Sequence, residues 1–511
     1  MQEMLKEYDV IIIGGGITGA GTARDCALRG LKVLLIERRD IADGATGRNH
    51  GLLHSGARYA VKDGESAREC IVENRILRRI APHCIEDTQG LFITLPEDEE
   101  TGYGLDYQKK FIEACRTAGI EAEAMDPREA IRWEPSVNPR LIGAVKVPDG
   151  SVDPFKLCAA NVLDARLHGA DILTYTEVLS LVKEDDTVRG VRVRDSRTGE
   201  TAEYHARVTV NAAGIWGQAI VQMAGARIAM FPAKGALLVF AHRVNNVVIN
   251  RCRKSADGDI LVPGDTVTVI GTTSTKIPFE ACDDLHVTPD EVELLLREGS
   301  QLCPALASTR ILRAYAGVRP QVASDDDPTG RSISRGIVCL DHATRDGIEG
   351  FVTITGGKLM TYRLMAEMAT DTVCAKLGVA VPCATATTPL PRTIERDFPA
   401  GSPDGMLVCE CENVTLGEIR SAVARFDIHS LADLRRRTRI GMGTCQGTYC
   451  IRKAAAALAE AQGRPADAER LAREYLDERW KGMMPVGWGD TLREMEFMQK
   501  VFKAGAPSTF K

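Results

Sequence analysis

The chain has 511 residues, 44% of them hydrophobic, and a formal net charge of -6 at pH 7. This length predicts two or three domains with ample apolar content to fill their cores. The nearly balanced charge argues against a general nucleic-acid binder and against an acidic tail.

The N-terminus and the cysteine content indicate the cellular compartment. The first residues, MQEMLKEYDV, lack the basic start and the apolar segment of a signal peptide, and no stretch approaches 18 uncharged apolar residues. Most of the fifteen cysteines stand singly in apolar runs, such as Cys26, Cys115 and Cys374, which argues against an extracellular disulfide framework. We therefore expect a cytoplasmic protein.

The first element in chain order is a βαβ unit at residues 8–40. Gly14, Gly16 and Gly19 form G-x-G-x-x-G between a β-branched strand and a helix, and Glu37 ends the next strand. The glycines allow a tight turn and close backbone approach, the helix N-terminus attracts a pyrophosphate, and the carboxylate accepts ribose hydroxyls. The unit predicts a dinucleotide site.

Three later segments favour FAD over NAD. Residues 43–60 form a long polar, glycine-rich stretch, and both 208–217 and 351–363 have a strand followed by glycine. A site built from distant pieces suits a cofactor held along its whole length. Short strands alternate with helices in the middle of the chain. We expect an α/β fold, with a Rossmann-like FAD-binding domain, an inserted, mostly antiparallel substrate-binding domain and a small helical, cysteine-rich C-terminal domain.

A change in composition near residues 380–405 marks the main linker. This stretch is rich in Pro, Thr and Gly, and Ala-, Glu- and Arg-rich helical sequence follows the cysteine segment. The predicted boundaries are an FAD-dependent oxidoreductase at 1–385 (FAD-binding pieces 8–80, 150–225 and 335–380; substrate-binding pieces 81–149 and 226–334), a linker at 386–405, an iron–sulfur-type domain at 406–460 and a helical tail at 461–511.

Four cysteines in the C-terminal segment form two close pairs. Cys409 and Cys411 make C-x-C, and Cys445 and Cys450 make C-x4-C. Four soft thiolates can hold zinc or an iron–sulfur cluster, whereas four unrelated thiols would not be expected to pair in this way. Between the pairs lies LRRRTR, whose arginines we expect to form a solvated helix face; docking a partner and tuning a cluster are the alternatives. These arginines are Arg435, Arg436, Arg437 and Arg439.

Several motifs together resemble a known family. GGGITGAG, HSGARY, NAAGIWG, GTTS, AGVRP and TGGKLMTYR occur in the order found in the glycerol-3-phosphate dehydrogenase branch of the D-amino-acid-oxidase-like flavoproteins. The resemblance runs from about residue 8 to 380. With the cysteine segment added, the whole chain is similar to the large (A) subunits of the anaerobic members. Residues 409–450 resemble the bacterioferritin-associated-ferredoxin-like [2Fe-2S] module, although that family commonly has C-x2-C as its second pair.

The resemblance implies an FAD-dependent, quinone-linked dehydrogenase. It would oxidise sn-glycerol 3-phosphate to dihydroxyacetone phosphate by hydride transfer to the flavin, and an iron–sulfur centre would pass the electrons on. The implied partners are an iron–sulfur membrane anchor and a second flavoprotein-type subunit. These partners would hold the chain peripherally on the inner face of the membrane. Two alternatives stay open: oxidation of a carboxylate-bearing 2-hydroxy acid or amine, since arginines also bind carboxylates, and a non-catalytic electron-transfer subunit.

The resemblance also assigns candidate site residues. Arg58, Tyr59, Arg319 and Arg335 would bind and position the substrate, because guanidinium groups match phosphate oxygens. Arg319 is also expected to act in catalysis, as are His54, a candidate proton acceptor, and Lys358, which would sit beside the pyrimidine edge of the flavin. Leu237 stands where the aerobic relatives have a histidine, so the general base stays open. The FAD-binding residues are expected to be Gly14, Gly16, Gly19, Glu37, Arg38, Thr46, Arg48, Asn49, His50, Val178, Ala213, Gly214, Gly357, Lys358, Leu359 and Met360.

Overall fold

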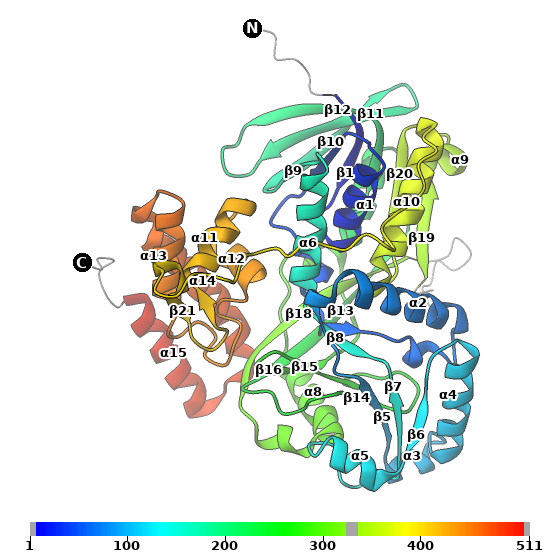
Figure 1. Cartoon of the computed structure of the whole chain (residues 1–511), viewed down its shortest axis with the longest axis vertical. Coiled ribbons are helices and arrows are strands. Elements are labelled where there is room, and N and C mark those ends of the chain that lie inside the picture. Colours follow the sequence, from blue (N-terminus) through cyan, green and yellow to red (C-terminus); the bar gives the residue numbers. More distant parts are fainter. Residues whose placement is uncertain (1–6, 323–335, 505–511) are drawn as a thin grey trace.

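A computed structural model describes residues 7–322 and 336–504. Two large sheets follow one another along the long axis of the molecule, and the C-terminal helices pack beside them (Figure 1). Within the described residues, none of the helices combines the length and the apolar character needed to cross a membrane.

The first sheet, at the upper end of Figure 1, is built around the N-terminal βαβ unit. Its central strands are mostly apolar and buried, and β1 runs parallel to both β2 and β12. Helix α1 packs against α6 and α10. The strands are β1 (Glu7–Ile13), β2 (Val33–Ile36), β9 (Asp171–Leu173), β10 (Thr176–Glu184), β11 (Thr187–Asp195), β12 (Thr201–Asn211), β19 (Ile337–Asp341) and β20 (Phe351–Gly356). The helices of this part are α1 (Ile17–Leu28), α2 (Gly64–Ile80), α6 (Pro154–Leu167), α7 (Gly217–Met223), α9 (His342–Asp346) and α10 (Tyr362–Leu377).

The second sheet is formed by chain segments that interrupt the first. Its pairs are antiparallel except for β14 with β5. The long strands β13 and β18 pair from Met230 opposite Val322 to Phe240 opposite Ile311. The strands are β5 (Gly90–Thr94), β6 (Glu123–Met125), β7 (Gly143–Val147), β13 (Met230–Phe240), β14 (Val248–Arg251), β15 (Ile260–Gly264), β16 (Val267–Gly271), β17 (Thr275–Lys276) and β18 (Ile311–Val322). The helices are α3 (Pro96–Glu100), α4 (Leu105–Thr117), α5 (Pro127–Trp133) and α8 (Pro289–Leu302), and a small third sheet comprises β3 (Leu52–Leu53), β4 (Ile85–Glu86) and β8 (Gly150–Val152).

The C-terminal part is small and mostly helical. A two-stranded hairpin precedes its helices, and the segment after α10 leads to it across the surface of the first part (Figure 1). Its elements are β21 (Leu407–Cys409), β22 (Val414–Thr415), α11 (Leu416–Arg425), α12 (Leu431–Thr438), α13 (Ile451–Ala461), α14 (Ala468–Met483) and α15 (Gly489–Ala504). The expected fold class is thus confirmed, and the domain boundaries stay predictions.

The arginines of α12 join the C-terminal part to the first sheet. Arg437, with a side chain only 2% exposed, pairs with Asp40, and its Nη1 lies 3.0 Å from the carboxylate. Arg436 pairs with Asp40 at 2.9 Å and also with Asp43. Arg439 follows the helix and lies 3.2 Å from Asp153 at the start of α6. The expectation of a solvated helix face is therefore wrong for these three arginines, because carboxylates distant in the sequence meet them.

Replacing Arg437 with alanine should destabilise the contact between the two parts. The change leaves the carboxylate of Asp40, itself 1% exposed, without one of its two arginines, and breaking a buried ion pair costs roughly 3–5 kcal/mol. Urea unfolding should show an earlier transition for the C-terminal part. Arg473→Ala is the control, because the Arg473 side chain is 62% exposed, and it should change the free energy of unfolding by less than about 0.5 kcal/mol. Coincident unfolding curves for Arg437→Ala and wild type would contradict a stabilising role for this ion pair.

Candidate active site and cysteine cluster

The glycine-rich turn after β1 brings three backbone segments into close contact. Gly14 has φ +113°, and a Cβ there would lie 2.6 Å from the carbonyl oxygen of Ala212 in the turn after β12. A Cβ at Gly19 would clash with the carbonyl oxygen of Gly14. These positions require glycine for turn geometry and for close helix–strand packing.

Glu37 is held at the end of β2 beside this turn. The backbone N–H groups of Gly15 and Arg39 donate to its carboxylate at 2.7 and 2.9 Å. Burial raises the pKa of Glu37, although these two donors oppose the shift. The side chain is therefore fixed where a ribose would reach it.

A cavity of about 460 Å³ extends from the glycine turn to the second sheet. Its walls come from distant parts of the chain, chiefly 13–59, 176–223 and 318–360. They include all the predicted FAD-binding residues except Gly19, which packs beneath the turn: Gly14, Gly16, Glu37, Arg38, Thr46, Arg48, Asn49, His50, Val178, Ala213, Gly214, Gly357, Lys358, Leu359 and Met360. This arrangement fits an extended dinucleotide. Trp216, which stacks 4.3 Å from the Arg38 guanidinium, also lines the cavity and was not predicted, although it lies within the motif NAAGIWG.

Four polar side chains line the same cavity and neighbour one another. The rings of His50 and His54 are 6.3 Å apart, those of His54 and Tyr59 are 5.5 Å apart, and Lys358 Nζ lies 4.7 Å from the centre of the Tyr59 ring. Burial, together with the charges of Arg58 and Arg319, lowers the pKa of His50 to about 3, so this imidazole is neutral at physiological pH.

Arg319 reaches the cavity from β18. Its Nη2 donates to the hydroxyl of Thr272 and, at 2.9 Å, to the carbonyl of Thr273. A Cβ at Gly235 would lie 2.7 Å from this nitrogen, so the facing strand β13 leaves space for the guanidinium. The two threonines belong to the GTTS motif, which thus positions an arginine 46 residues further along the chain.

Arg58 and Arg335 have different outcomes. Arg58 pairs at 3.1 Å with the buried carboxylate of Asp259, which also binds Arg253 at 2.7 Å, and Arg58 is not among the residues that line the cavity. No signal in the sequence pointed to Asp259. Arg335 lies outside the described residues. The substrate-binding roles of both arginines stay predictions.

The four C-terminal cysteines come together at one place. The Sγ of Cys411 lies 3.8 Å from that of Cys409 and 3.7 Å from that of Cys445. Hydrogen bonds from the Cys450 thiol lower the pKa of Cys409 to about 6 and that of Cys445 to about 5, while the pKa of Cys450 is raised. Four converging thiols, two of them readily ionised, fit a metal cluster with thiolate ligands. The other eleven cysteines are free, and all except Cys339 and Cys383 are buried, as expected.

The loop at 441–450 is shaped to approach these sulfurs. A Cβ at Gly443 would lie 2.7 Å from the Cys411 sulfur, so glycine allows the close approach. Gln446 has φ +49°, and its buried side-chain amide donates to the carbonyls of Met442 and Gly443 at 2.8 and 3.0 Å. These bonds stabilise the turn that accommodates the longer C-x4-C spacing.

Comparison with known proteins agrees with both sites. Residues 9–363 match the family described as FAD dependent oxidoreductase, and residues 407–460 match the BFD-like [2Fe-2S] binding domain. Two solved structures share the fold: a glycerol-3-phosphate dehydrogenase from Bacillus halodurans complexed with FAD (TM-score 0.57, 23% identity, covering 92% of this chain and 82% of that one) and an FAD-bound L-alpha-glycerophosphate oxidase from Mycoplasma pneumoniae (TM-score 0.60, 20% identity, 76% and 100%).

Fold and site together define an FAD-dependent oxidoreductase that carries a [2Fe-2S]-binding domain. The chain is 60% identical to the A subunit of the anaerobic glycerol-3-phosphate dehydrogenase of Escherichia coli (strain K12), over 98% of this chain and 96% of that protein. It is 42% identical to the A1 subunit of the anaerobic glycerol-3-phosphate dehydrogenase of Haloferax volcanii, over 96% and 89%. The chain belongs to the family of large (A) subunits of anaerobic glycerol-3-phosphate dehydrogenases.

Proposed function

We propose that the chain oxidises sn-glycerol 3-phosphate to dihydroxyacetone phosphate and passes the electrons through its cysteine cluster to further subunits and a quinone. The observation that carries this proposal is the 60% identity, over nearly the whole chain, to a protein of that name. The flavin cavity and the converging cysteines support it, because the reaction needs both a hydride acceptor and a one-electron carrier.

Arg319 is the proposed clamp for the substrate phosphate. Thr272 and Thr273 hold its guanidinium at the cavity wall, so the planar fork is oriented before substrate binds. Arg58 lies near enough to depress the pKa of His50, and its pairing with Asp259 keeps it in place as a second, more distant cation. Arg335 is proposed as a further contact by family resemblance alone.

The proton of the substrate hydroxyl needs an acceptor in the same cavity. When FAD is bound, it supplies the hydride acceptor. His54 is the proposed proton acceptor, because it lines the cavity between His50 and Tyr59. Lys358 would bring a positive charge to the flavin edge of this wall, where negative charge develops on reduction.

Electrons are proposed to leave through the C-terminal part. Cys409, Cys411, Cys445 and Cys450 would hold a [2Fe-2S] cluster, and α12 docks this part beside the loop that follows Glu37. The relatives are named as subunits, so we propose that further subunits accept the electrons and that the chain associates with the membrane peripherally through them.

Anaerobic titration of the purified protein tests the substrate. Glycerol 3-phosphate should bleach the flavin absorption near about 450 nm, since a substrate-level dehydrogenase is reduced directly by its substrate. Parallel titrations with 2-hydroxyglutarate and sarcosine are the comparison. Bleaching only by one of these would replace the proposed substrate with a carboxylate-bearing one. No bleaching by any of the three would favour a non-catalytic electron-transfer subunit.

A further inference from the structure

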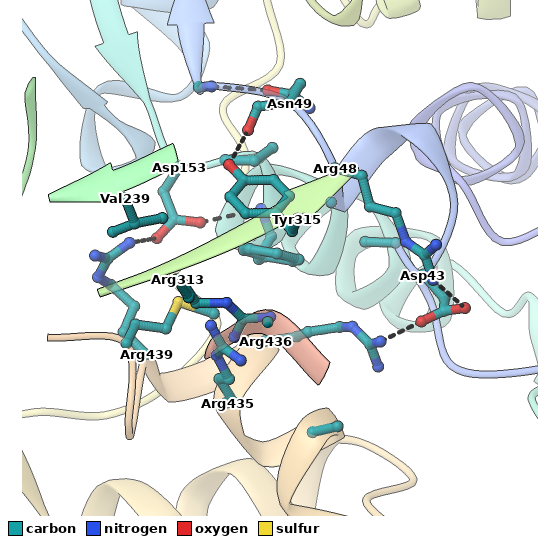
Figure 2. A pocket seen from close by; sticks show the side chains of 18 of the residues that line it. Asp43, Arg48, Asn49, Asp153, Val239, Arg313, Tyr315, Arg435, Arg436 and Arg439 are labelled. Atoms are coloured by element: carbon teal, nitrogen blue, oxygen red, sulfur yellow. Dashed lines mark hydrogen bonds and ion pairs between the residues drawn. The ribbon is translucent and has the colours of Figure 1, made fainter. Parts of the chain in front are cut away.

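A second cavity, of about 630 Å³, lies between the C-terminal part and the two sheets. Strands β13 and β18 contribute Val239, Arg313 and Tyr315, and the opposite wall comes from α12, α14 and the cysteine loop (Figure 2). Tyr315 donates to the carbonyl of Asn49 at 2.8 Å, and Asn49 lines both this cavity and the flavin cavity. The second cavity therefore lies between the flavin site and the cysteine loop.

Almost every positive charge on the wall of this cavity is matched by a carboxylate. Arg436 pairs with Asp40 and Asp43, and Arg439 pairs with Asp153 (Figure 2). The same holds, at up to 3.9 Å, for the other lysines and arginines of the wall except Arg435: Arg39, Arg48, Lys156, Arg313 and Lys481. In the part of the chain that the structure describes, Arg435 alone among them has no carboxylate within ion-pair distance.

Arg435 faces a second incompletely matched cation, Arg313. Their side chains lie close together at the cavity in Figure 2. Arg313 is 7% exposed, and its one carboxylate neighbour, Glu478, is 3.9 Å away with a side chain 55% exposed. The Nε atoms of both arginines are buried and have no hydrogen-bond partner among the described residues. Burial, and next the charge of Arg313, lowers the pKa of Arg435 to about 10.

Two guanidinium groups this close are costly without a counter-charge. Buried charges are normally paired, and a buried N–H without an acceptor loses the hydrogen bond that water would have given it. The cavity is large enough for a small organic molecule, since ligand sites commonly measure about 300–1,000 Å³. The missing element is thus an anion with several acceptor oxygens.

We propose that Arg313 and Arg435 form a binding site for a phosphate group, distinct from the substrate site at Arg319. The planar forks of two arginines match the oxygens of a phosphate, and its negative charge would relieve their mutual repulsion. The phosphate can come from free phosphate ion or from a phosphate monoester whose organic part occupies the rest of the cavity. Neither Arg313 nor Arg435 lines the flavin cavity, so the site does not depend on the proposed reaction.

The test measures phosphate binding with the proposed substrate clamp removed. Calorimetric titration of the cofactor-loaded Arg319→Ala protein with inorganic phosphate should show one site per chain. Adding Arg435→Gln should weaken this binding at least tenfold, whereas adding Arg473→Gln, which removes an exposed charge outside the cavity, should not change it. Titration with phenyl phosphate distinguishes the sources, since tighter binding than phosphate indicates a monoester and weaker binding indicates the free ion.

Thermal unfolding gives a second readout that does not use Arg319→Ala. Phosphate should raise the Tm of wild type and of Arg473→Gln, and this rise should be much smaller in Arg435→Gln. Arg435→Lys keeps the charge without the fork and should show an intermediate rise. Arg435→Gln should retain the wild-type kcat/KM for glycerol 3-phosphate with an artificial acceptor within about twofold, because Arg435 is remote from the flavin cavity. The proposal is overturned if Arg319→Ala binds no phosphate, or if Arg435→Gln binds it as tightly as its parent.

Discussion

Replacing Arg319 with alanine is expected to lower kcat/KM for glycerol 3-phosphate by about 30-fold to 4,000-fold. This range corresponds to the roughly 2–5 kcal/mol lost when one partner of a buried charge pair is removed. The physical reason is the fixed guanidinium: Thr272 and Thr273 hold it at the cavity wall, so the substrate phosphate would lose an arginine that is already oriented.

Steady-state kinetics with an artificial acceptor measure this effect, and the flavin content of each preparation shows whether FAD is retained. Arg297→Ala is the matched control, because its side chain on α8 is 59% exposed, and it should leave kcat/KM unchanged. Arg319→Lys should fall between wild type and alanine, since a lysine keeps the charge but loses the planar fork. Near-normal kinetics for Arg319→Ala with full flavin content would remove Arg319 from the substrate site.

Cys445→Ser should separate flavin reduction from electron delivery. The Cys445 sulfur lies 3.7 Å from that of Cys411, and its pKa of about 5 makes it a thiolate at neutral pH. Losing this ligand should reduce the iron and acid-labile sulfide of anaerobically purified protein. Bleaching of the flavin by glycerol 3-phosphate should persist, because the flavin cavity has no wall in the cysteine loop.

Transfer of electrons to the partner subunits should slow by at least about tenfold in the same variant, because the one-electron carrier is lost. Cys339→Ser is the control, since Cys339 is a half-buried thiol on β19, away from the cluster. Metal analysis and EPR spectroscopy of wild type decide the premise. Zinc, or no metal at all, in wild-type protein purified without oxygen would exclude the electron relay.

The flavin site was largely predictable because its signals are local. Gly14, Gly19 and Glu37 act through turn geometry and backbone contact within one βαβ unit, and the structure shows each in such a contact. The two cysteine pairs were equally visible, because thiols spaced in pairs seldom serve only as core residues. The structure adds that their sulfurs converge, and that Gln446 stabilises the unusual C-x4-C loop.

The partners of charged residues could not be predicted in the same way. Sequence alone suggested a solvated face for LRRRTR, whereas Arg437 is buried against Asp40, 397 residues earlier in the chain. Arg58 was expected at the substrate, and its pairing with Asp259 had no signal in the sequence. Charge pairing depends on which segments the fold brings together, and neither composition nor spacing specifies that.

The sequence by itself therefore determined the cofactor class, the two centres and their order along the chain, because these follow from short motifs whose residues act on one another or on a ligand nearby. Only the tertiary structure decided how the centres are joined. The pairing of β13 with β18 places Arg319 in the flavin cavity, and Arg313, on the same strand, in the cavity beside the cysteine loop. Two residues on one strand thus serve different cavities, because long-range packing sets what surrounds each of them.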